Sequence, residues 1–282
     1  MKRYLITGGL GHIGSHVVDA LIDRGDEVVV IDNLATGNMA FKNPKAEVLM
    51  MSVDQVLDAK VLAGKTFDGV FHLAAFSHIR MGCDEPLRAE RNGANLTVAM
   101  LTLCVELSIP KFVFISSVAV DFNPGLPYSI EKAAGERHCA FFEKRFGLKT
   151  SIIRIHSVYG SPRQGTVTGN LVPSLLDQRQ RLGKIQITGD GSQVRDFVYY
   201  TDAVNAILAA EHREGVSVIG TCEGHSVLEL AQHFNCPIEF IGKPVVEAER
   251  QVCVKSDYPT LVSFSQGMAR LALAPKRLDM LE

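Results

Sequence analysis

The stretch Thr7-Gly8-Gly9-Leu10-Gly11-His12-Ile13-Gly14 decides the fold. It follows a short apolar run at Arg3–Thr7 and opens a helix-length segment at His12–Arg24. Glycines in such a turn permit a tight bend, close approach of backbone to a pyrophosphate, and close packing of helix on strand. The helix would also present unpaired N–H groups and the positive end of its dipole to phosphates. The stretch therefore predicts a dinucleotide-binding turn.

An acidic residue stands where such a turn needs one. Asp32 ends the expected strand Glu27–Asp32, 18 residues after Gly14. A carboxylate at this place can accept both hydroxyls of the adenosine ribose and would repel a 2′-phosphate. The pattern favours NAD over NADP. The alternative is a glycine turn followed by a solvated aspartate at a strand end.

Strands and helices alternate along the first half of the chain. Runs such as Val28-Val29-Val30-Ile31 are apolar without alternation, as strands buried on both faces should be. The expected strands are Arg3–Thr7, Glu27–Asp32, Glu47–Met51, Gly69–Leu73, Lys111–Ser116 and Lys149–His156. The expected helices are His12–Arg24, Pro86–Leu107 and Tyr128–Phe146. This order predicts an α/β fold with a Rossmann-type, doubly wound parallel sheet.

The sequence pattern changes near residue 160. The region that contains Pro162 and Pro173 is expected to be rich in loops, and the helices and strands expected after it are shorter. We expect an NAD-binding domain over residues 1–160 and a smaller substrate-binding region over residues 161–282. Some later segments could return to the first domain.

Composition narrows the class of protein. The 282 residues carry a net charge of −2, which gives no reason to expect a nucleic-acid or membrane partner. Six cysteines lack C-x-x-C spacing and suit reduced thiols, and the histidines lack metal-site spacing, so no metal is expected. No apolar run suits a signal peptide or a membrane span. These features predict a cytoplasmic protein.

A serine, a tyrosine and a lysine form the candidate chemical centre. Tyr128 and Lys132 are spaced i, i+4 at a helix start and share one face. A nearby ammonium stabilises a phenolate and lowers the pKa of tyrosine, which makes proton transfer feasible near neutral pH. Ser117 closes the fifth strand and could hydrogen-bond the same substrate oxygen. The alternative is an ordinary amphipathic helix start with a solvated lysine.

With these features the chain resembles the extended short-chain dehydrogenase/reductases, specifically the NAD-dependent nucleotide-sugar epimerase/dehydratase family. The resemblance is clearest up to about residue 230. Its motifs are Asp32-Asn33-Leu34 with Thr36-Gly37-Asn38, His72-Leu73-Ala74-Ala75, Phe114-Ile115-Ser116-Ser117, Arg154 followed by Tyr159-Gly160, Asn170-Leu171-Val172-Pro173 and Gly189-Asp190-Gly191-Ser192-Gln193-Val194-Arg195-Asp196-Phe197.

The resemblance implies a role for each matching residue. Arg195 would pair with the substrate diphosphate, since a guanidinium suits phosphate oxygens; the alternative is a surface ion pair with Asp196. Cofactor contacts would come from Gly8, Gly11, His12, Ile13, Gly14, Asp32, Asn33, Ser52, Val53, Leu73, Ala74, Ala75, Asn92, Tyr128 and Lys132. Substrate contacts would come from Ser77, Ser157, Asn170, Leu171 and Arg195.

Some positions depart from the family pattern. The connection from Ser117 to Tyr128 spans only 11 positions, which is short for the family. Ser157 replaces a common asparagine, and Ser52-Val53 stands where an aspartate often helps hold adenine. We therefore expect a sugar pocket that is more open or differently shaped.

The surroundings of Ser117 bear on the reaction. Family dehydratases carry an acidic pair after this residue and decarboxylases a nearby glutamate, whereas Val118-Ala119 follows here. This absence favours NAD-dependent 4-epimerisation of a nucleotide sugar, with Tyr128 as base. Alternatives are a dehydratase, a ketosugar reductase, or an NAD-binding protein with little catalysis.

Proteins of the family commonly form dimers, so the resemblance also implies an assembly of two copies. The apolar helix Ala94–Leu107 and the phenylalanines Phe141, Phe142 and Phe146 could form a helix-bundle contact between two copies. We expect a homodimer. The alternative is a monomer that covers these faces internally.

Overall fold

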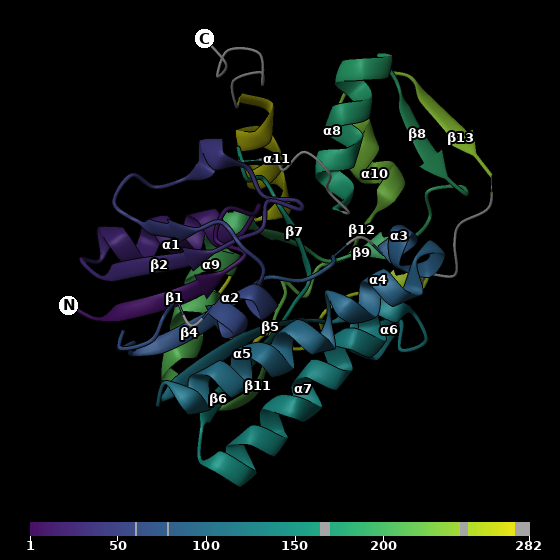
Figure 1. Cartoon of the computed structure of the whole chain (residues 1–282). Coiled ribbons are helices and arrows are strands. Elements are labelled where there is room, and N and C mark those ends of the chain that lie inside the picture. Colours follow the sequence, from purple (N-terminus) through teal and green to yellow (C-terminus); the bar gives the residue numbers. More distant parts are fainter. Residues whose placement is uncertain (60, 78, 164–169, 243–247, 274–282) are drawn as a thin grey trace.

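A parallel sheet of seven strands forms the centre of the computed structural model, which describes residues 1–59, 61–77, 79–163, 170–242 and 248–273 (Figure 1). The strand order is β11-β6-β5-β4-β1-β2-β3, and every neighbouring pair is parallel. The strands are β1 (Arg3–Thr7), β2 (Glu27–Ile31), β3 (Glu47–Leu49), β4 (Gly69–His72), β5 (Lys111–Ser117), β6 (Lys149–Ile155) and β11 (Gly215–Ile219). Each strand expected in the first half is present, with its end shifted by at most two residues.

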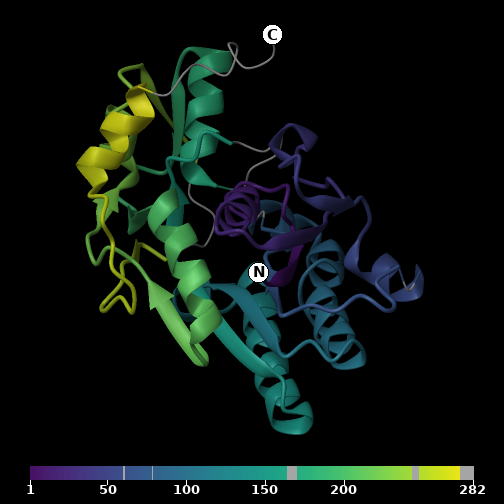
Figure 2. The ribbon, with the colours of Figure 1, turned by 90° about the vertical axis from the view of Figure 1, so that its left-hand side faces the viewer.

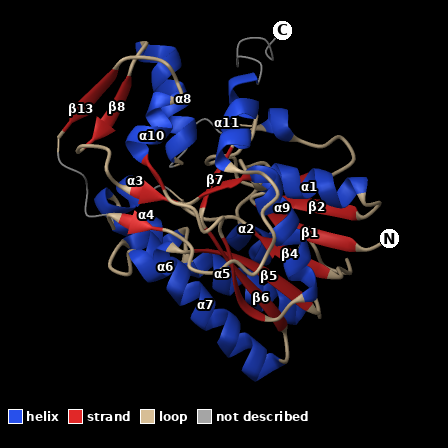
Figure 3. Cartoon of the chain, turned by 180° about the vertical axis from the view of Figure 1, so that it is seen from behind, coloured by secondary structure: helices blue, strands red, loops and turns tan. Residues whose placement is uncertain are grey.

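Helices cover both faces of this sheet (Figure 3). One face carries α1 (Gly14–Asp23) and α9 (Tyr200–Ala209); the other carries α2 (Val53–Ala59), α5 (Ala94–Glu106) and α7 (Pro127–Phe146). Successive strand residues point to opposite faces. Ile6 therefore packs into the apolar cluster on the α1 face, while Leu5 packs into the cluster on the α5 face. Burial on both faces confirms the predicted Rossmann-type, doubly wound sheet.

The strand order reverses between β1 and β4. From β1 the chain builds outward to β2 and β3, then crosses back to β4 on the other side of β1. The connections that leave the carboxyl ends of β1 and β4 therefore diverge and leave a crevice between them. The glycine turn follows β1 and Leu73-Ala74-Ala75 follows β4, so both candidate segments meet at this crevice.

The predicted helix Pro86–Leu107 is wrong as a single element. It is split into α4 (Pro86–Arg91) and α5, after a preceding short helix α3 (Ile79–Asp84). Gly93 breaks the helix, with φ −113° and ψ −109°. A Cβ on Gly93 would lie 2.6 Å from the Cβ of Glu131, so this glycine also lets the chain approach α7 closely.

The smaller part has its own apolar core, which includes Tyr159, Leu175 and Leu230. Figure 2 shows the ribbon of this part from the side, with Phe264–Leu273 as the yellow helix on the left. Its longer elements are α8 (Leu171–Leu182), β8 (Ile185–Thr188), α10 (Val227–Gln232), β13 (Ile238–Ile241) and α11 (Phe264–Leu273). Its short strands are β7 (Ser157–Tyr159), β9 (Val194–Arg195), β10 (Phe197–Tyr199), β12 (His225–Ser226) and β14 (Arg250–Gln251). β9 lies between β12 and β14, and β7 pairs with β10.

Two later segments return to the large sheet. β11 pairs with β6 at the sheet edge, and α9 packs against α1. Residues beyond 160 thus contribute to both parts of the molecule. Within the described residues, none of the helices has the length and apolar character that a membrane crossing requires.

Candidate active site

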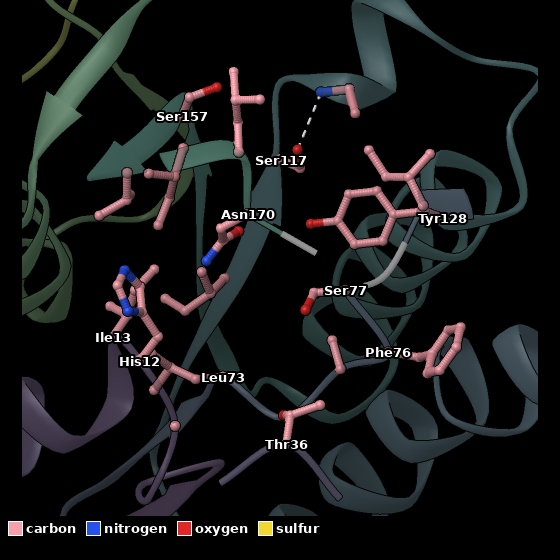
Figure 4. A pocket seen from close by; sticks show the side chains of 18 of the residues that line it. His12, Ile13, Thr36, Leu73, Phe76, Ser77, Ser117, Tyr128, Ser157 and Asn170 are labelled. Carbon is pink, nitrogen blue, oxygen red and sulfur yellow. Dashed lines mark hydrogen bonds between the residues drawn. The ribbon is translucent and has the colours of Figure 1, made fainter. Parts of the chain in front are cut away.

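A cavity of about 740 Å³ is lined both by the carboxyl ends of the large sheet and by the smaller part. Figure 4 shows its interior, with side chains from both parts pointing inward. Every residue that the sequence singled out lines this one cavity. These are Gly8, Gly11, His12, Ile13, Gly14, Asp32, Asn33, Ser52, Val53, Leu73, Ala74, Ala75, Ser77, Asn92, Ser117, Tyr128, Lys132, Ser157, Asn170, Leu171 and Arg195.

The glycine turn is packed too tightly for side chains. Gly8 has φ +71°, and a Cβ there would lie 2.8 Å from the amide nitrogen of Ala74. A Cβ on Gly14 would lie 2.1 Å from the carbonyl oxygen of Gly8. No side chain of the described residues caps the start of α1, where Gly11, Ile13 and Gly14 line the cavity. Uncapped N–H groups at a helix start suit a pyrophosphate, so this turn fits a dinucleotide.

His12 connects the glycine turn to the chain entering the smaller part. Its Nδ1 hydrogen-bonds the carbonyl oxygen of Arg163 at 2.7 Å, and its Nε2 is buried with no partner among the described residues. Burial lowers the pKa of His12. One turn later, Nε2 of His16 lies 2.8 Å from the Ser161 hydroxyl. A neutral His12 is therefore part of the cavity wall (Figure 4).

Asp32 is buried and fixed by main-chain donors. Its Oδ2 accepts the amide of Leu10 at 2.9 Å, and its Oδ1 accepts the amide of Leu34 at 2.8 Å. Each carboxylate oxygen can accept a further bond. A Cβ on Gly37 would lie 2.8 Å from Oδ1, so glycine there leaves the carboxylate in place. Asp32 thus lines the cavity in a fixed orientation, which fits the predicted acceptor of ribose hydroxyls.

The Thr7 side chain of β1 holds the cavity-lining segment that follows β4. The Thr7 hydroxyl accepts the amide of Ala74 at 3.1 Å and lies 2.7 Å from Nδ1 of His72. Asn92 caps the end of α4, and its carbonyl accepts the amide of Phe76 at 3.1 Å. These bonds fix the segment after β4 beside the glycine turn.

Tyr128 is the second residue of α7, whose first residue is Pro127. Proline suits this place, since its fixed φ is helical and its missing N–H is not needed there. The Tyr128 ring points into the cavity toward Ser117 (Figure 4). Burial raises the pKa of Tyr128, and a hydrogen bond with the Ser117 hydroxyl opposes that rise. The two hydroxyls thus lie within hydrogen-bonding reach of each other in the cavity.

Lys132 lies one turn further along α7 and is buried. Its Nζ donates to the carbonyl oxygen of Ile115 at 2.6 Å and lies 5.9 Å from the centroid of the Tyr128 ring. Burial lowers the pKa of Lys132 to about 8, against the opposing effect of Glu136. The lysine therefore still carries charge near neutral pH, behind the tyrosine.

Glu136 and Arg154 form a buried network behind the centre that the sequence reading missed. Glu136 accepts Nε of Arg154 at 2.9 Å, Nη2 at 2.6 Å, and the Ser116 hydroxyl at 2.5 Å. Since Ser116 precedes Ser117, this network holds the end of β5. Glu136 is spaced i+4 from Lys132 and i+8 from Tyr128, a spacing that could have indicated a shared face.

The short connection between Ser117 and Tyr128 is folded and is held in place by hydrogen bonds. It contains the one-turn helix α6 (Ala119–Phe122), and the Ser117 hydroxyl accepts the amide of Ala119 at 3.1 Å. Asp121 accepts two bonds from Arg154, at 2.7 and 2.9 Å. Asn123 accepts the amide of Ala248 at 2.6 Å, which ties the connection to the smaller part.

Arg195 lies on β9 and is only 6% exposed, which contradicts the surface ion pair considered above. Its Nη1 donates to the carbonyl oxygens of Val194 and Ala248, both at 3.0 Å. The neighbouring Asp196 accepts amide bonds from Thr221 and elsewhere in the same junction. Asn170 immediately precedes α8 and Leu171 begins it, and both line the cavity.

Several polar residues at the substrate end escaped sequence reasoning. The main-chain amide of Gln186 donates a hydrogen bond to the side-chain oxygen of Gln178 at 2.7 Å, and both residues line the cavity. Other polar lining residues to which the sequence assigned no contact include Thr36, Arg88, Ser174, Thr188, Gln193 and Gln251. Thr36 and Gln193 lie in motifs of the family, whereas Arg88, Ser174, Thr188 and Gln251 belong to none, and only the folded chain brings them together.

Comparisons with known proteins agree with this geometry. The model of the NAD dependent epimerase/dehydratase family matches residues 4–220. A putative UDP-glucose 4-epimerase of Methanocaldococcus jannaschii is 32% identical over 263 residues, covering 88% of this chain and 86% of that protein. The crystal structure of Thermotoga maritima UDP-glucose 4-epimerase with UDP-glucose has a TM-score of 0.90 and 26% identity, covering 99% of this chain and 100% of that one. The Thermus thermophilus UDP-glucose 4-epimerase complex with NAD has a TM-score of 0.88 and 26% identity, covering 95% and 97%.

Fold and cavity define a Rossmann-type, dinucleotide-dependent enzyme with an added smaller part. The chain belongs to the NAD-dependent epimerase/dehydratase family. Its cofactor is NAD, as the place of Asp32 predicted. The predicted family and the expectation of an NAD-dependent enzyme are thereby confirmed.

Proposed function

We propose that the protein is a nucleotide-sugar 4-epimerase. One observation carries this choice within the family: Asp32 is the only carboxylate among the described residues that line the cavity, and it belongs to the cofactor end. Val118 and Ala119, which follow Ser117, line the cavity without bringing an acid. Elimination of water or loss of carbon dioxide would need an acidic group near the sugar. Oxidation and re-reduction at C4 need only the groups that are present.

The chain's own residues supply the proton chemistry. Tyr128, as a phenolate, takes the proton of the C4 hydroxyl, and Ser117 donates a hydrogen bond to the same oxygen. The Lys132 ammonium favours the phenolate because opposite charge lowers the pKa of a tyrosine. NAD, when bound, supplies a hydride acceptor at the start of the cycle and a hydride donor at its end. Tyr128 returns the proton to the C4 oxygen to close the cycle.

Epimerisation also requires the ketosugar to present its other face. The wall beside Tyr128 includes the apolar side chains of Phe76 and Val118. Such side chains offer a sugar no hydrogen bonds, so they do not fix one face of its ring. The nucleotide end, in contrast, must stay held while the sugar turns.

Arg195 is the residue we assign to that holding role. Two of its hydrogen bonds go to main-chain carbonyls, which orient the guanidinium, and a guanidinium group suits the oxygens of a diphosphate. Asn170 and Leu171 would contact the nucleotide from the start of α8, and Ser77 and Ser157 would border the sugar. UDP-sugars are the first candidates, because the relatives described above are UDP-glucose 4-epimerases.

The test is to incubate the protein and NAD with UDP-, GDP-, CDP- and dTDP-sugars and to identify products by NMR. The expected product is a C4 epimer without net NADH, and the Tyr128→Phe variant should form none. An unsaturated or deoxy product, or net NADH, would replace epimerisation by another reaction of the family. Tight NAD binding with no turnover of any sugar would indicate a binding protein instead.

We also propose that two copies associate through α5 and α7. Phe141 and Phe146 on α7 are 55% and 47% exposed, while Phe142 between them is buried. Large exposed aromatic side chains on one helix are typical of an association surface. Phe141→Asp should shift the protein to the monomer in sedimentation measurements, whereas a monomeric parent protein would contradict the proposal.

A further inference from the structure

Two cysteines meet at the junction of the large sheet and the smaller part. Cys222 follows β11 and is exposed, Cys253 follows β14 and is buried, and both are free thiols. They lie 31 positions apart in the sequence. One oxygen holds both segments: Oδ2 of Asp196 accepts the amide of Cys222 at 2.9 Å and that of Cys253 at 3.2 Å. The two amide nitrogens can be no farther apart than these two bonds allow.

The side chains of the two cysteines face each other. The Cys222 side chain lies close enough to the Cys253 thiol to contribute to the raised pKa of that thiol. Gly220 makes room for this contact, since a Cβ there would lie 2.4 Å from the Cβ of Cys253. A disulfide needs Cα atoms roughly 4–7 Å apart with side chains directed toward one another. The shared anchor on Asp196 keeps the two main-chain segments together, and the mutual proximity of the two side chains fits such a bond.

The backbone of Cys222 is also unusual. Its φ is +63°, a left-handed conformation that non-glycine residues adopt at a cost. Asp196 helps to hold it there, because Oδ1 accepts the amide of Thr221 at 2.8 Å and Oδ2 accepts the amide of Cys222 itself. The turn thus keeps an exposed thiol pointed at a buried one.

A metal site is the competing explanation for this cluster. Ligand atoms of His156, Asp196 and Cys253 lie within 4.8 Å of one another. The Asp196 carboxylate, however, already accepts four hydrogen bonds: two at Oδ1 from Thr221, at 2.8 and 2.6 Å, and two at Oδ2. A carboxylate has about four lone-pair positions, so a cation would have to displace main-chain donors that hold the turn. The geometry favours thiol chemistry over metal binding.

We propose that Cys222 and Cys253 form a redox-responsive pair that low-molecular-weight disulfides oxidise. The Cys222 thiolate attacks one sulfur of the small disulfide, forms a mixed disulfide and releases one small thiolate. Cys253, after losing its proton, attacks the Cys222 sulfur and releases the second small thiolate. The two cysteines lose two electrons to the small disulfide, and the two protons leave with the small thiols.

His156 is placed to assist the second step. Burial lowers the pKa of its imidazole, which leaves a neutral ring beside the Cys253 thiol. Burial, and after it the Cys222 thiol, raise the pKa of Cys253 to about 12, and converting Cys222 into a disulfide removes the second of these causes. The resulting bond would fasten the turn after β11 to β14, next to Arg195 and Gln251 on the cavity wall.

The test treats the folded protein with oxidised glutathione, blocks remaining thiols with an alkylating agent, and maps peptides by mass spectrometry. We expect one Cys222–Cys253 linked peptide, the loss of two hydrogens from the protein, and reversal by dithiothreitol. The oxidised protein should also unfold at higher Tm, since the link closes a long loop of the unfolded chain. Cys222→Ser should abolish both effects, whereas Cys83→Ser, which removes another exposed thiol, should preserve them.

Two outcomes would overturn the proposal. One is a glutathione adduct that persists on Cys222 while Cys253 remains a thiol in the folded protein. The other is one equivalent of zinc bound to the reduced protein and lost in Cys253→Ala, which would make the cluster of His156, Asp196 and Cys253 a metal site.

Discussion

The two ends of the cavity are built by different means. At the cofactor end, the shape comes from the main chain: Gly8 and Gly14 leave no room for side chains, and Asp32 is fixed by two amides. At the substrate end, single side chains such as Gln186 and Arg195 converge from distant segments. A site made of backbone tolerates few substitutions, while a site made of side chains can change one residue at a time. Cofactor choice is therefore built into the fold, and substrate choice is not.

The Tyr128→Phe substitution tests the residue at which the cofactor end and the substrate end of the cavity meet, and it should have the largest effect on activity. Removing the hydroxyl that moves the proton should lower kcat by about 10³-fold. NAD affinity should stay unchanged, because the glycine turn and Asp32 are untouched. Product formation measured by NMR, with NAD binding measured by calorimetry, checks both statements. A kcat that falls less than tenfold would remove Tyr128 from the reaction.

Gly14→Ala tests whether the cofactor end depends on backbone. The new Cβ would lie 2.1 Å from the carbonyl oxygen of Gly8, so the turn must open. We expect the Kd for NAD to rise about 100-fold, since losing the phosphate contacts costs roughly 3 kcal/mol. The matched control is Gly125→Ala, where an added Cβ meets nothing within 4 Å. Equal NAD affinity in both variants would show that the turn is not the phosphate site.

Arg195→Lys tests the substrate end alone. A lysine cannot reproduce the planar fork of a guanidinium on a diphosphate. KM for the nucleotide sugar should rise roughly 30-fold, as expected for lost charge-assisted hydrogen bonds, while NAD affinity stays the same. The exposed Arg181→Lys serves as control. If NAD binding and KM change together, the two ends are coupled and the contrast between them fails.

Glu136→Gln should have the smallest effect, a shift in pH dependence. Lys132 acts as a cation, and its pKa of about 8 predicts that activity falls as pH rises through that value. Glu136 raises the pKa of Lys132, so neutralising it should move the alkaline limb of kcat to lower pH by less than about one unit. Exposed Glu106→Gln should leave the limb in place. A purely structural role for Glu136 would instead lower kcat equally at every pH.

The same contrast explains what could be predicted from sequence. Gly8, Gly14 and Asp32 act through local spacing, so motif and function coincide in one short stretch. Tyr128 and Lys132 also share one helix turn. Gln251, in contrast, lies in no motif, because only tertiary packing turns a lone glutamine into a cavity residue.

The misjudged helix Pro86–Leu107 has a similar cause. Its apolar pattern is continuous, and one glycine inside a helix is usually tolerated. Contact with Glu131 on a helix far along the chain decides the break at Gly93. Local propensity could not show that contact.

The return of α9 and β11 to the large sheet means that the molecule has no point at which one cut would yield two independent modules. A chain ending near residue 160 would leave β6 as an open sheet edge and expose the apolar surface that Ala203 and Ile207 cover. The substrate region therefore cannot be grafted onto another dinucleotide domain as a block. New specificities in such a scaffold must come from substitutions within one continuous, interwoven chain.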